Sequence, residues 1–162
     1  MANSQRLVFL SSFMDDAVVV KFARTHPDAR KPSKGSANAA GWDLYSLESV
    51  DVPFRSSVKL RTGIHVAIPL GFEGQVRARS SLGSKGLILP HSIGTIDSDY
   101  RGELFVLMTW IGGGDSYLVK SGERIAQLVI TPIPEVEFKE SRLEELGETE
   151  RGRGGFGSTG RF

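Results

Sequence analysis

The chain has 162 residues, 40% hydrophobic and 24% charged, which is typical of one globular domain with its own core. Its net charge of +1 gives no overall field to attract nucleic acid. The absence of cysteine excludes disulfides, thiolate metal sites and cysteine nucleophiles.

Residues 1–16 are interpreted as an N-terminal extension, either a short arm or an added strand. Their apolar stretch, LVFLSSF at 7–13, is too short to cross a membrane and lacks the small-residue cleavage site of a secretory signal. A transit peptide would carry more arginine. We therefore expect a cytoplasmic or nuclear protein with neither a membrane nor nucleic acid among its partners.

Alternation of apolar and polar residues predicts strands along most of the chain. In GIHVAI at 63–68, Ile64, Val66 and Ile68 share one face, and in EGQVRAR at 73–79, Val76 and Ala78 point inward. Further strands are expected at 17–22, 57–60, 103–110, 117–119, 125–131 and 135–138. Turn residues separate several of them, as in PLG at 69–71 and GGGD at 112–115.

Helical periodicity is weak throughout, and the best candidate, ESRLEELGE at 140–148, meets Gly147 after two leucines. Many short strands separated by glycine and proline predict an all-β sandwich or barrel, which we place at 17–146. Such a fold lacks the crossover helices of a dinucleotide-binding sheet.

The C-terminal stretch RGRGGFGSTG at 151–160 carries the glycine spacing of a dinucleotide-binding loop and nearly that of a Walker A loop. Both loops lead into a helix, and only five residues follow Gly157. We interpret residues 147–162 as a flexible glycine-rich arm whose amides, with Arg151 and Arg153, suit phosphate oxygens. Phe156 either clips into a groove on the body or stacks on a flat ligand.

Four further stretches carry polar chemistry on the β background: AAGWDL at 39–44, RARSSLGSKG at 77–86, GTIDSDYRGEL at 94–104 and GERIAQLVI at 122–130. With the C-terminal stretch, and in this order, they resemble the five motifs of the trimeric dUTP nucleotidohydrolases (dUTPases). The resemblance covers roughly residues 18–160. It implies an all-β, jelly-roll-like barrel with a C-terminal arm, and an enzyme that hydrolyses dUTP to dUMP and pyrophosphate.

The resemblance also implies roles for individual residues. Asp97 matches the carboxylate that orients and activates the attacking water, and Tyr100 the ring packed under the deoxyribose. Residues 91–97 match a hairpin whose main chain pairs with uracil, and the arm closes over the nucleotide. The expected substrate-binding residues are Arg79, Ser80, Ser81, His91, Gly94, Thr95, Ile96, Asp97, Tyr100, Phe105, Gln127, Arg151, Phe156, Gly157, Ser158 and Thr159.

Mg²⁺ is the expected cofactor, held mainly by the substrate phosphates, with Asp43 acting on it only through water. The resemblance further implies a homotrimer whose sites are shared between subunits. One chain would supply the first, second and fourth motifs, another the third, and the last the arm.

Three residues depart from the usual family pattern. Trp42 replaces a smaller residue, which we interpret as a packing change, and Ala78 stands where proline is common. His91 occupies a hairpin position where a contact to the base is common, so it is either a solvated side chain or a ligand contact.

Two alternative functions are considered. A dCTP deaminase of the same fold needs a glutamate in the strand after the third motif, where this chain reads FVLMTW at 105–110, with Leu107. A family member that has lost catalysis would act as an interaction module, although Asp97, Tyr100, Arg151 and Phe156 are all present.

Overall fold

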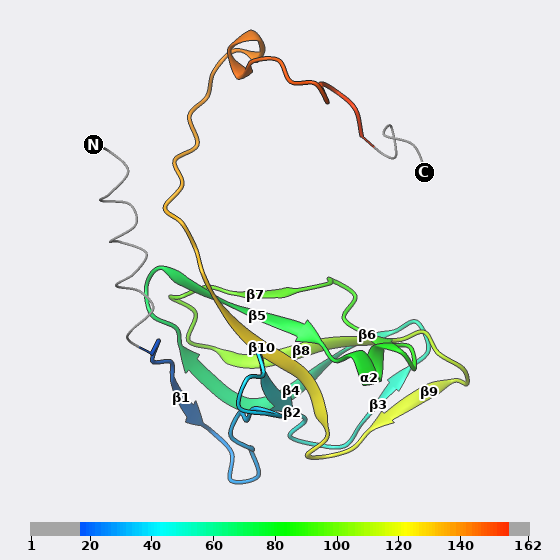
Figure 1. Ribbon diagram of the computed structural model, residues 1–162. Helices are drawn as coiled ribbons and strands as arrows, with labels where there is room; N and C mark the ends of the chain where they lie inside the picture. Colours follow the sequence, from blue (N-terminus) through cyan, green and yellow to red (C-terminus); the bar gives the residue numbers. More distant parts are fainter. Residues whose placement is uncertain (1–16, 156–162) are drawn as a thin grey trace.

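The computed structural model describes residues 17–155, which fold into two four-stranded antiparallel sheets and a two-stranded ribbon (Figure 1). In spatial order, the first sheet consists of β1 (Lys21–Arg24), β4 (Ser57–Ala67), β8 (Glu103–Trp110) and β6 (Leu87–Ile88). The second consists of β2 (Trp42–Tyr45), β10 (Arg124–Pro132), β5 (Phe72–Ala78) and β7 (Gly94–Ile96). The ribbon pairs β3 (Val50–Pro53) with β9 (Ser116–Val119), and the helical elements are α2 (Ser80–Gly83) and the 3₁₀ turn η1 (Leu143–Leu146).

The core lies between the sheets and is built from the inward-facing residues of alternating strands. On β4 and β8, Leu60, Ile64, Leu104, Val106 and Met108 are almost fully buried, while Arg61, His65, Phe105 and Leu107 on the other face are half-buried. This alternation follows from the two-residue period of a strand with one covered face. The expected all-β, jelly-roll-like fold is confirmed.

Most predicted strands are present, with changes at their boundaries. The stretches 57–60 and 63–68 belong to the single strand β4, which is continuous through a register shift between Arg61 and His65. The first strand begins at Lys21, later than expected. Strands β2, β3, β6 and β7 were not predicted; each has two to four residues, which leaves little alternation to read.

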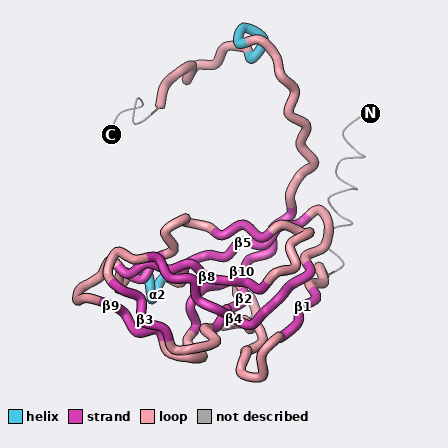
Figure 2. The backbone as a smooth tube through the Cα atoms, turned by 180° about the vertical axis from the view of Figure 1, so that it is seen from behind, coloured by secondary structure: helices cyan, strands magenta, loops and turns pink. Residues whose placement is uncertain are grey.

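The prediction of a strand at 135–138 is wrong. These residues have no paired neighbour among the described strands, and Phe138 is 97% exposed. The chain leaves the body after β10 and runs outward as an extended segment interrupted by η1 and by a turn at 150–153 (Figure 2). Alternation cannot predict a strand where no partner strand is present. Within residues 17–155, no helix is both long and apolar enough to cross a membrane.

Candidate active site

The third motif forms a cavity of about 290 Å³ on the outer face of the β4–β8 pair. Its lining residues are Lys59, Thr95, Ile96, Asp97, Tyr100, Glu103 and Phe105. Asp97 and Tyr100 lie at the two ends of a turn, in which the Tyr100 amide donates to the Asp97 carbonyl at 3.1 Å. The structure therefore brings together the predicted water-activating carboxylate, the predicted deoxyribose ring and Phe105.

The Tyr100 ring is fixed in position. Its hydroxyl donates to the Glu103 carbonyl at 2.9 Å, and the ring lies directly over Gly102. A Cβ at Gly102 would come within 2.3 Å of the Tyr100 hydroxyl oxygen, so only glycine fits beneath this ring. This close approach explains the glycine in the sequence YRGEL.

The Glu103 carboxylate binds the main chain of β4 at its register shift and is not a free acid in the cavity. Its Oε1 accepts from the amides of Gly63 at 2.8 Å and Thr62 at 3.2 Å, and its Oε2 accepts from Arg61 at 3.0 Å. Burial of the Glu103 carboxyl acts to raise its pKa, but these hydrogen bonds and the Arg61 charge outweigh burial and lower the pKa below its usual value. Glu103 therefore stays ionised and is occupied by structural contacts.

The strand β7, which carries Gly94, Thr95 and Ile96, lies at the edge of its sheet and pairs only with β5. Its other edge exposes main-chain donors and acceptors. The preceding turn contains Ser92 with a φ of 66°, a left-handed conformation that non-glycine residues rarely adopt. The exposed His91 packs its ring on Gly94, where a built Cβ would lie 3.2 Å from Cε1.

A second cluster joins the first, second and fourth motifs. The Asp43 carboxylate pairs with Arg79 Nε at 3.2 Å and with Arg124 Nη1 at 3.3 Å, and its side chain is only 13% exposed. Arg79 Nη1 also donates to the Arg124 carbonyl at 3.2 Å. Two arginines on one carboxylate leave the cluster with one net positive charge, which suits phosphate.

Strand register builds this cluster. Gln127 on β10 lies opposite Asp43 on β2 and opposite Arg77 on β5, and its amide donates to the Ala78 carbonyl at 3.2 Å. A Cβ at Gly41 would come within 2.6 Å of the Gln127 amide oxygen, so a larger residue there would displace the end of the Gln127 side chain.

Ser80 and Ser81 follow Arg79 directly, as exposed residues of the single turn α2. Their hydroxyls therefore open to solvent beside the cluster of Asp43, Arg79, Arg124 and Gln127.

The two groups of predicted residues lie far apart in one chain. Arg79 follows the last residue of β5 and Asp97 follows the last residue of β7, and these strands are antiparallel. The two residues therefore lie at opposite ends of the strand pair, roughly 20 Å apart at about 3.3 Å per residue.

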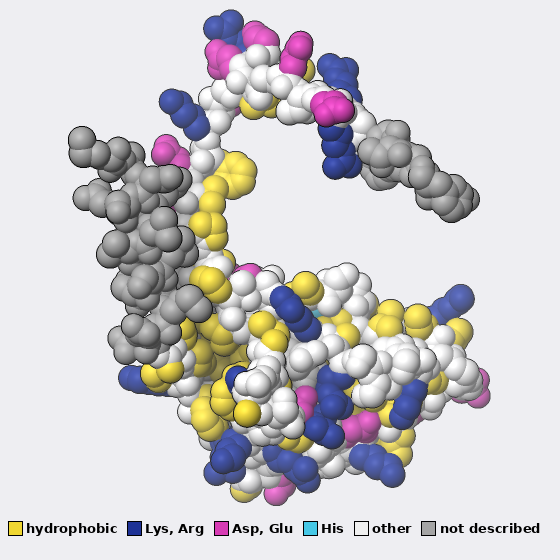
Figure 3. Space-filling model, viewed as in Figure 1, with side chains coloured by type: hydrophobic (Ala, Val, Ile, Leu, Met, Phe, Trp, Pro, Cys, Tyr) yellow, Lys and Arg dark blue, Asp and Glu magenta, His cyan; other side chains and the backbone are white. Residues whose placement is uncertain are grey.

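The arm is separate from both groups. Arg151 Nε donates to the Gly154 carbonyl at 3.0 Å, and Figure 3 shows this segment standing clear of the body. The other predicted arm residues, Phe156, Gly157, Ser158 and Thr159, lie outside the described residues.

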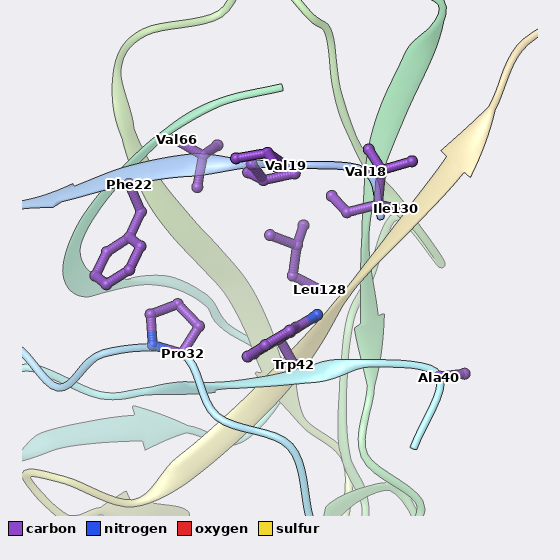
Figure 4. A pocket seen from close by; sticks show the side chains of 10 residues that line it. Val18, Val19, Phe22, Pro32, Ala40, Trp42, Val66, Leu128 and Ile130 are labelled. Atoms are coloured by element: carbon purple, nitrogen blue, oxygen red, sulfur yellow. The ribbon is translucent and has the colours of Figure 1, made fainter. Parts of the chain in front are cut away.

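A larger cavity of about 440 Å³ lies beside β1, β2 and β10 and contains none of the predicted site residues (Figure 4). Its walls are apolar and include Val18, Phe22, Trp42, Leu128 and Ile130. The unusual Trp42 thus packs against apolar side chains, and it also receives Lys34 Nζ at 5.4 Å from its ring centroid. This cavity offers no group for acid–base chemistry.

Three residues near these groups were not predicted: Arg124, Glu103 and Lys59. Arg124 contacts Asp43 across two strands far apart in sequence, and Glu103 and Lys59 belong to the outer face of β4 and β8. The only signal in the sequence was the position of Arg124 and Glu103 inside two of the polar stretches that resemble family motifs. Their partners follow from strand register, which periodicity alone does not give.

A sequence model of the dUTPase family matches residues 28–160. The chain is 45% identical to the deoxyuridine 5′-triphosphate nucleotidohydrolase of Candida albicans over 139 residues, which cover 83% of this chain and 84% of the relative. It is 42% identical to the human mitochondrial enzyme of the same name over 144 residues, covering 88% of this chain and 55% of the relative.

Solved structures agree with these sequence matches. The dUTPase of Staphylococcus bacteriophage 80alpha with dUPNHPP superposes with a TM-score of 0.81 at 30% identity, covering 88% of this chain and 98% of the other. A mutant dUTPase from phage phi11 of S. aureus, which coordinates a structural Mg(II) ion, superposes with a TM-score of 0.71 at 25% identity, covering 78% and 99%. With the motif residues gathered in the two groups described above, these matches show that the chain belongs to the dUTPase family.

Proposed function

We propose that the protein hydrolyses dUTP to dUMP and pyrophosphate. The observation that carries the proposal is the Asp97 cavity, in which an exposed carboxylate and a fixed Tyr100 ring share one space in a member of the dUTPase family. The relatives named for this reaction support the same substrate.

Asp97 acts as the general base. Its carboxylate has no hydrogen-bond or ion-pair partner within residues 17–155, so both oxygens are available to a water molecule. The oriented water attacks the α-phosphorus, Asp97 accepts its proton, and the bond to the leaving pyrophosphate breaks. A positioned base of this kind contributes on the order of 10²–10⁴-fold to the rate.

Sugar and base selection come from rigid elements. The Tyr100 ring, held between Gly102 and the Glu103 carbonyl, leaves no room for a 2′-hydroxyl under the deoxyribose. The free edge of β7 presents main-chain groups to uracil O2, N3–H and O4, and these groups mismatch the amino group of cytosine. His91, which packs on Gly94, borders this edge.

The phosphates bind to Arg79, Ser80, Ser81 and Gln127 and to the arm. The cluster around Asp43 carries net positive charge, and the exposed hydroxyls of α2 lie next to it. Arg151 reaches the γ-phosphate while Phe156, Gly157, Ser158 and Thr159 close over the nucleotide, which also excludes bulk water.

Mg²⁺ is carried by the substrate phosphates. Both carboxylate oxygens of Asp43 are taken by arginines, and residues 17–155 contain no group of three acidic or histidine side chains suited to a metal. This donor set fits an ion held by phosphate oxygens and water, with Asp43 in its outer sphere. When bound, the ion neutralises charge on the triphosphate.

We place the complete site between subunits of a homotrimer. Asp97 and Arg79 lie roughly 20 Å apart along the β5–β7 pair. Phosphate groups joined through single oxygen atoms do not bridge that span, which supports a site to which two different chains supply the two residues.

Mixed oligomers test the shared site. Asp97→Asn and Arg79→Ala chains, each nearly inactive alone, should regain about a quarter of the wild-type activity after random mixing, since one quarter of the shared sites carries both intact residues. Two inactive variants that stay inactive after denaturation and co-refolding would contradict the shared site.

Deamination of dCTP is disfavoured by the geometry of β8. Residues 105–110 carry no carboxylate, and Glu103 at the start of the strand is bound by Arg61, Thr62 and Gly63. An interaction module would not need Asp97 free beside a fixed Tyr100.

Product analysis tests the reaction. The protein is incubated with Mg²⁺ and dUTP, dCTP, dTTP or UTP, and phosphorus products are followed by NMR. Conversion of dUTP alone to dUMP and pyrophosphate is expected. If dUTP and the other three nucleotides all stay intact, the protein acts as an interaction module instead.

A further inference from the structure

Lys59 borders the Asp97 cavity, although it lies outside all five dUTPase-like motifs. It projects from the outer face of β4, opposite Leu107 of β8 and two residue pairs along the ladder from the pair of Arg61 and Phe105. Its Nζ lies 3.7 Å from the centroid of the Phe105 ring. An aromatic face at this distance attracts an ammonium and restricts a side chain that is otherwise among the most mobile.

The two cations on this face of β4 differ in their partners. Arg61 is paired with the Glu103 carboxylate at 3.0 Å, while Lys59 has no ion pair with any described residue. The Lys59 charge is therefore uncompensated by a carboxylate and held by a neutral ring at the wall of the cavity.

We propose that Lys59 is a further substrate-binding residue, which contacts the α-phosphate of the nucleotide, and that Phe105 holds its ammonium in position. This inference rests on the proposed function, in which the deoxyribose lies on Tyr100 and the α-phosphorus next to Asp97. The ligand class is a nucleoside 5′-phosphate.

The proposed contact between Lys59 and the α-phosphate has an electrostatic reason. Asp97 must stay anionic to act as a base, and an anion beside the α-phosphate repels it. A cation in the same cavity offsets this repulsion without hydrogen-bonding to Asp97, and it stabilises the negative charge of the phosphate oxygens. Arg61 cannot do this, since Glu103 holds it.

The test compares two ligands that differ only in the phosphate. dUMP and 2′-deoxyuridine are titrated by calorimetry into the wild-type protein and into the variants Lys59→Met, Lys59→Arg and Lys120→Met. Lys120, an exposed residue after β9 that does not line the cavity, is the matched control for loss of one positive charge.

Lys59→Met should weaken dUMP binding by about tenfold or more, as expected for loss of a charged hydrogen bond, and leave deoxyuridine binding unchanged. Lys59→Arg should retain most of the dUMP affinity, and Lys120→Met should retain both affinities. Because Lys59 is exposed, thermal melting of all variants should match the wild type.

Two outcomes would overturn the inference. Equal weakening of dUMP and deoxyuridine would mean that Lys59 acts on the sugar pocket through Phe105, and unchanged binding of both would make it a solvated cation. A wild-type protein that binds neither ligand would instead refute the proposed function. If Lys59→Met melts early, Lys59→Gln against Lys59→Arg gives the same contrast.

Discussion

The carboxylate of Asp43 lies between two arginines, at 3.2 Å from Arg79 and 3.3 Å from Arg124, whereas that of Asp97 has no partner within residues 17–155. Asp43 is 13% exposed and is built into the contact of three strands, while Asp97 sits on an exposed turn. The difference shows that residue type alone does not assign a role. A paired carboxylate orients its neighbours, and a free one beside a cavity can take a proton.

The cavity lined by Asp97 also contains a paired carboxylate, that of Glu103. It borders the same space as Asp97 but accepts five hydrogen bonds from Arg61, Thr62 and Gly63. We therefore expect substitutions of Asp97 to change the chemistry, and substitutions of Asp43 or Glu103 to change positioning and stability.

Asp97→Asn, which replaces the unpaired carboxylate, has the largest expected effect. The amide cannot accept a proton, so kcat should fall by about 10²–10⁴-fold while the melting temperature stays unchanged. Steady-state kinetics and thermal melting measure the two quantities. Asp99→Asn, an exposed acid in the same turn, is the matched control and should keep near-wild-type kcat.

Gly102→Ala tests whether the fixed ring next to Asp97 sets sugar selection. The new Cβ would come within 2.3 Å of the Tyr100 hydroxyl oxygen, so the ring must move. We expect KM for dUTP to rise about tenfold, as for a lost well-packed contact, and discrimination against UTP to weaken. Gly113→Ala, at a position with nothing within 4 Å, should change neither. Retained selectivity in Gly102→Ala would remove Tyr100 as the selector.

Asp43→Asn replaces the carboxylate that is paired with two arginines. Removing the charge leaves Arg79 and Arg124 without an ionic partner, and we expect the free energy of unfolding to fall by about 1–2 kcal/mol. KM should rise more than kcat falls, because the arginines no longer hold their phosphate-facing positions. Chemical denaturation at fixed protein concentration and steady-state kinetics measure both effects. Asp51→Asn, at an exposed position of β3, should leave both unchanged.

The sequence predicted the fold class because alternation survives in the long strands. Ile64, Val66 and Val76 were placed on the inner face and are buried, since a strand with one covered face must alternate. The strand at 135–138 failed for the complementary reason, because alternation says nothing about whether a neighbouring strand exists. Recognition of the family came from the five ordered motifs and not from periodicity.

The sequence predicted the stretches that carry the site residues, but not the contacts between those stretches. Asp97 and Tyr100 share one turn, so the sequence alone placed them together. The contacts among Asp43, Arg79 and Arg124 depend on the register of β2, β10 and β5, to which no single stretch points. Lys59 joins the cavity through an antiparallel partner more than forty residues away, so no motif could contain it.

Glu103→Gln tests what the charge of a paired carboxylate contributes, because glutamine keeps the shape of the side chain and removes its charge. The amide oxygen can still accept from Gly63 and Thr62, but the ion pair with Arg61 is lost. We expect the free energy of unfolding to fall by about 1 kcal/mol near neutral pH, with kcat nearly unchanged. Glu73→Gln, a carboxylate on β5 without an ion pair among the described contacts, is the control.

The pH dependence of that difference tests its cause. The pKa of Glu103 is lowered in the folded protein from its ordinary value of 4.5, so its ionised form is the one that stabilises the fold. The contribution is therefore fully present above about pH 4.5 and is lost as pH falls through the lower folded-state pKa. The stability gap between wild type and Glu103→Gln should narrow on acidification and should not change between pH 6 and 8. A gap of equal size at pH 3 and pH 7 would mean that the glutamine distorts β4, and that charge is not what Glu103 supplies.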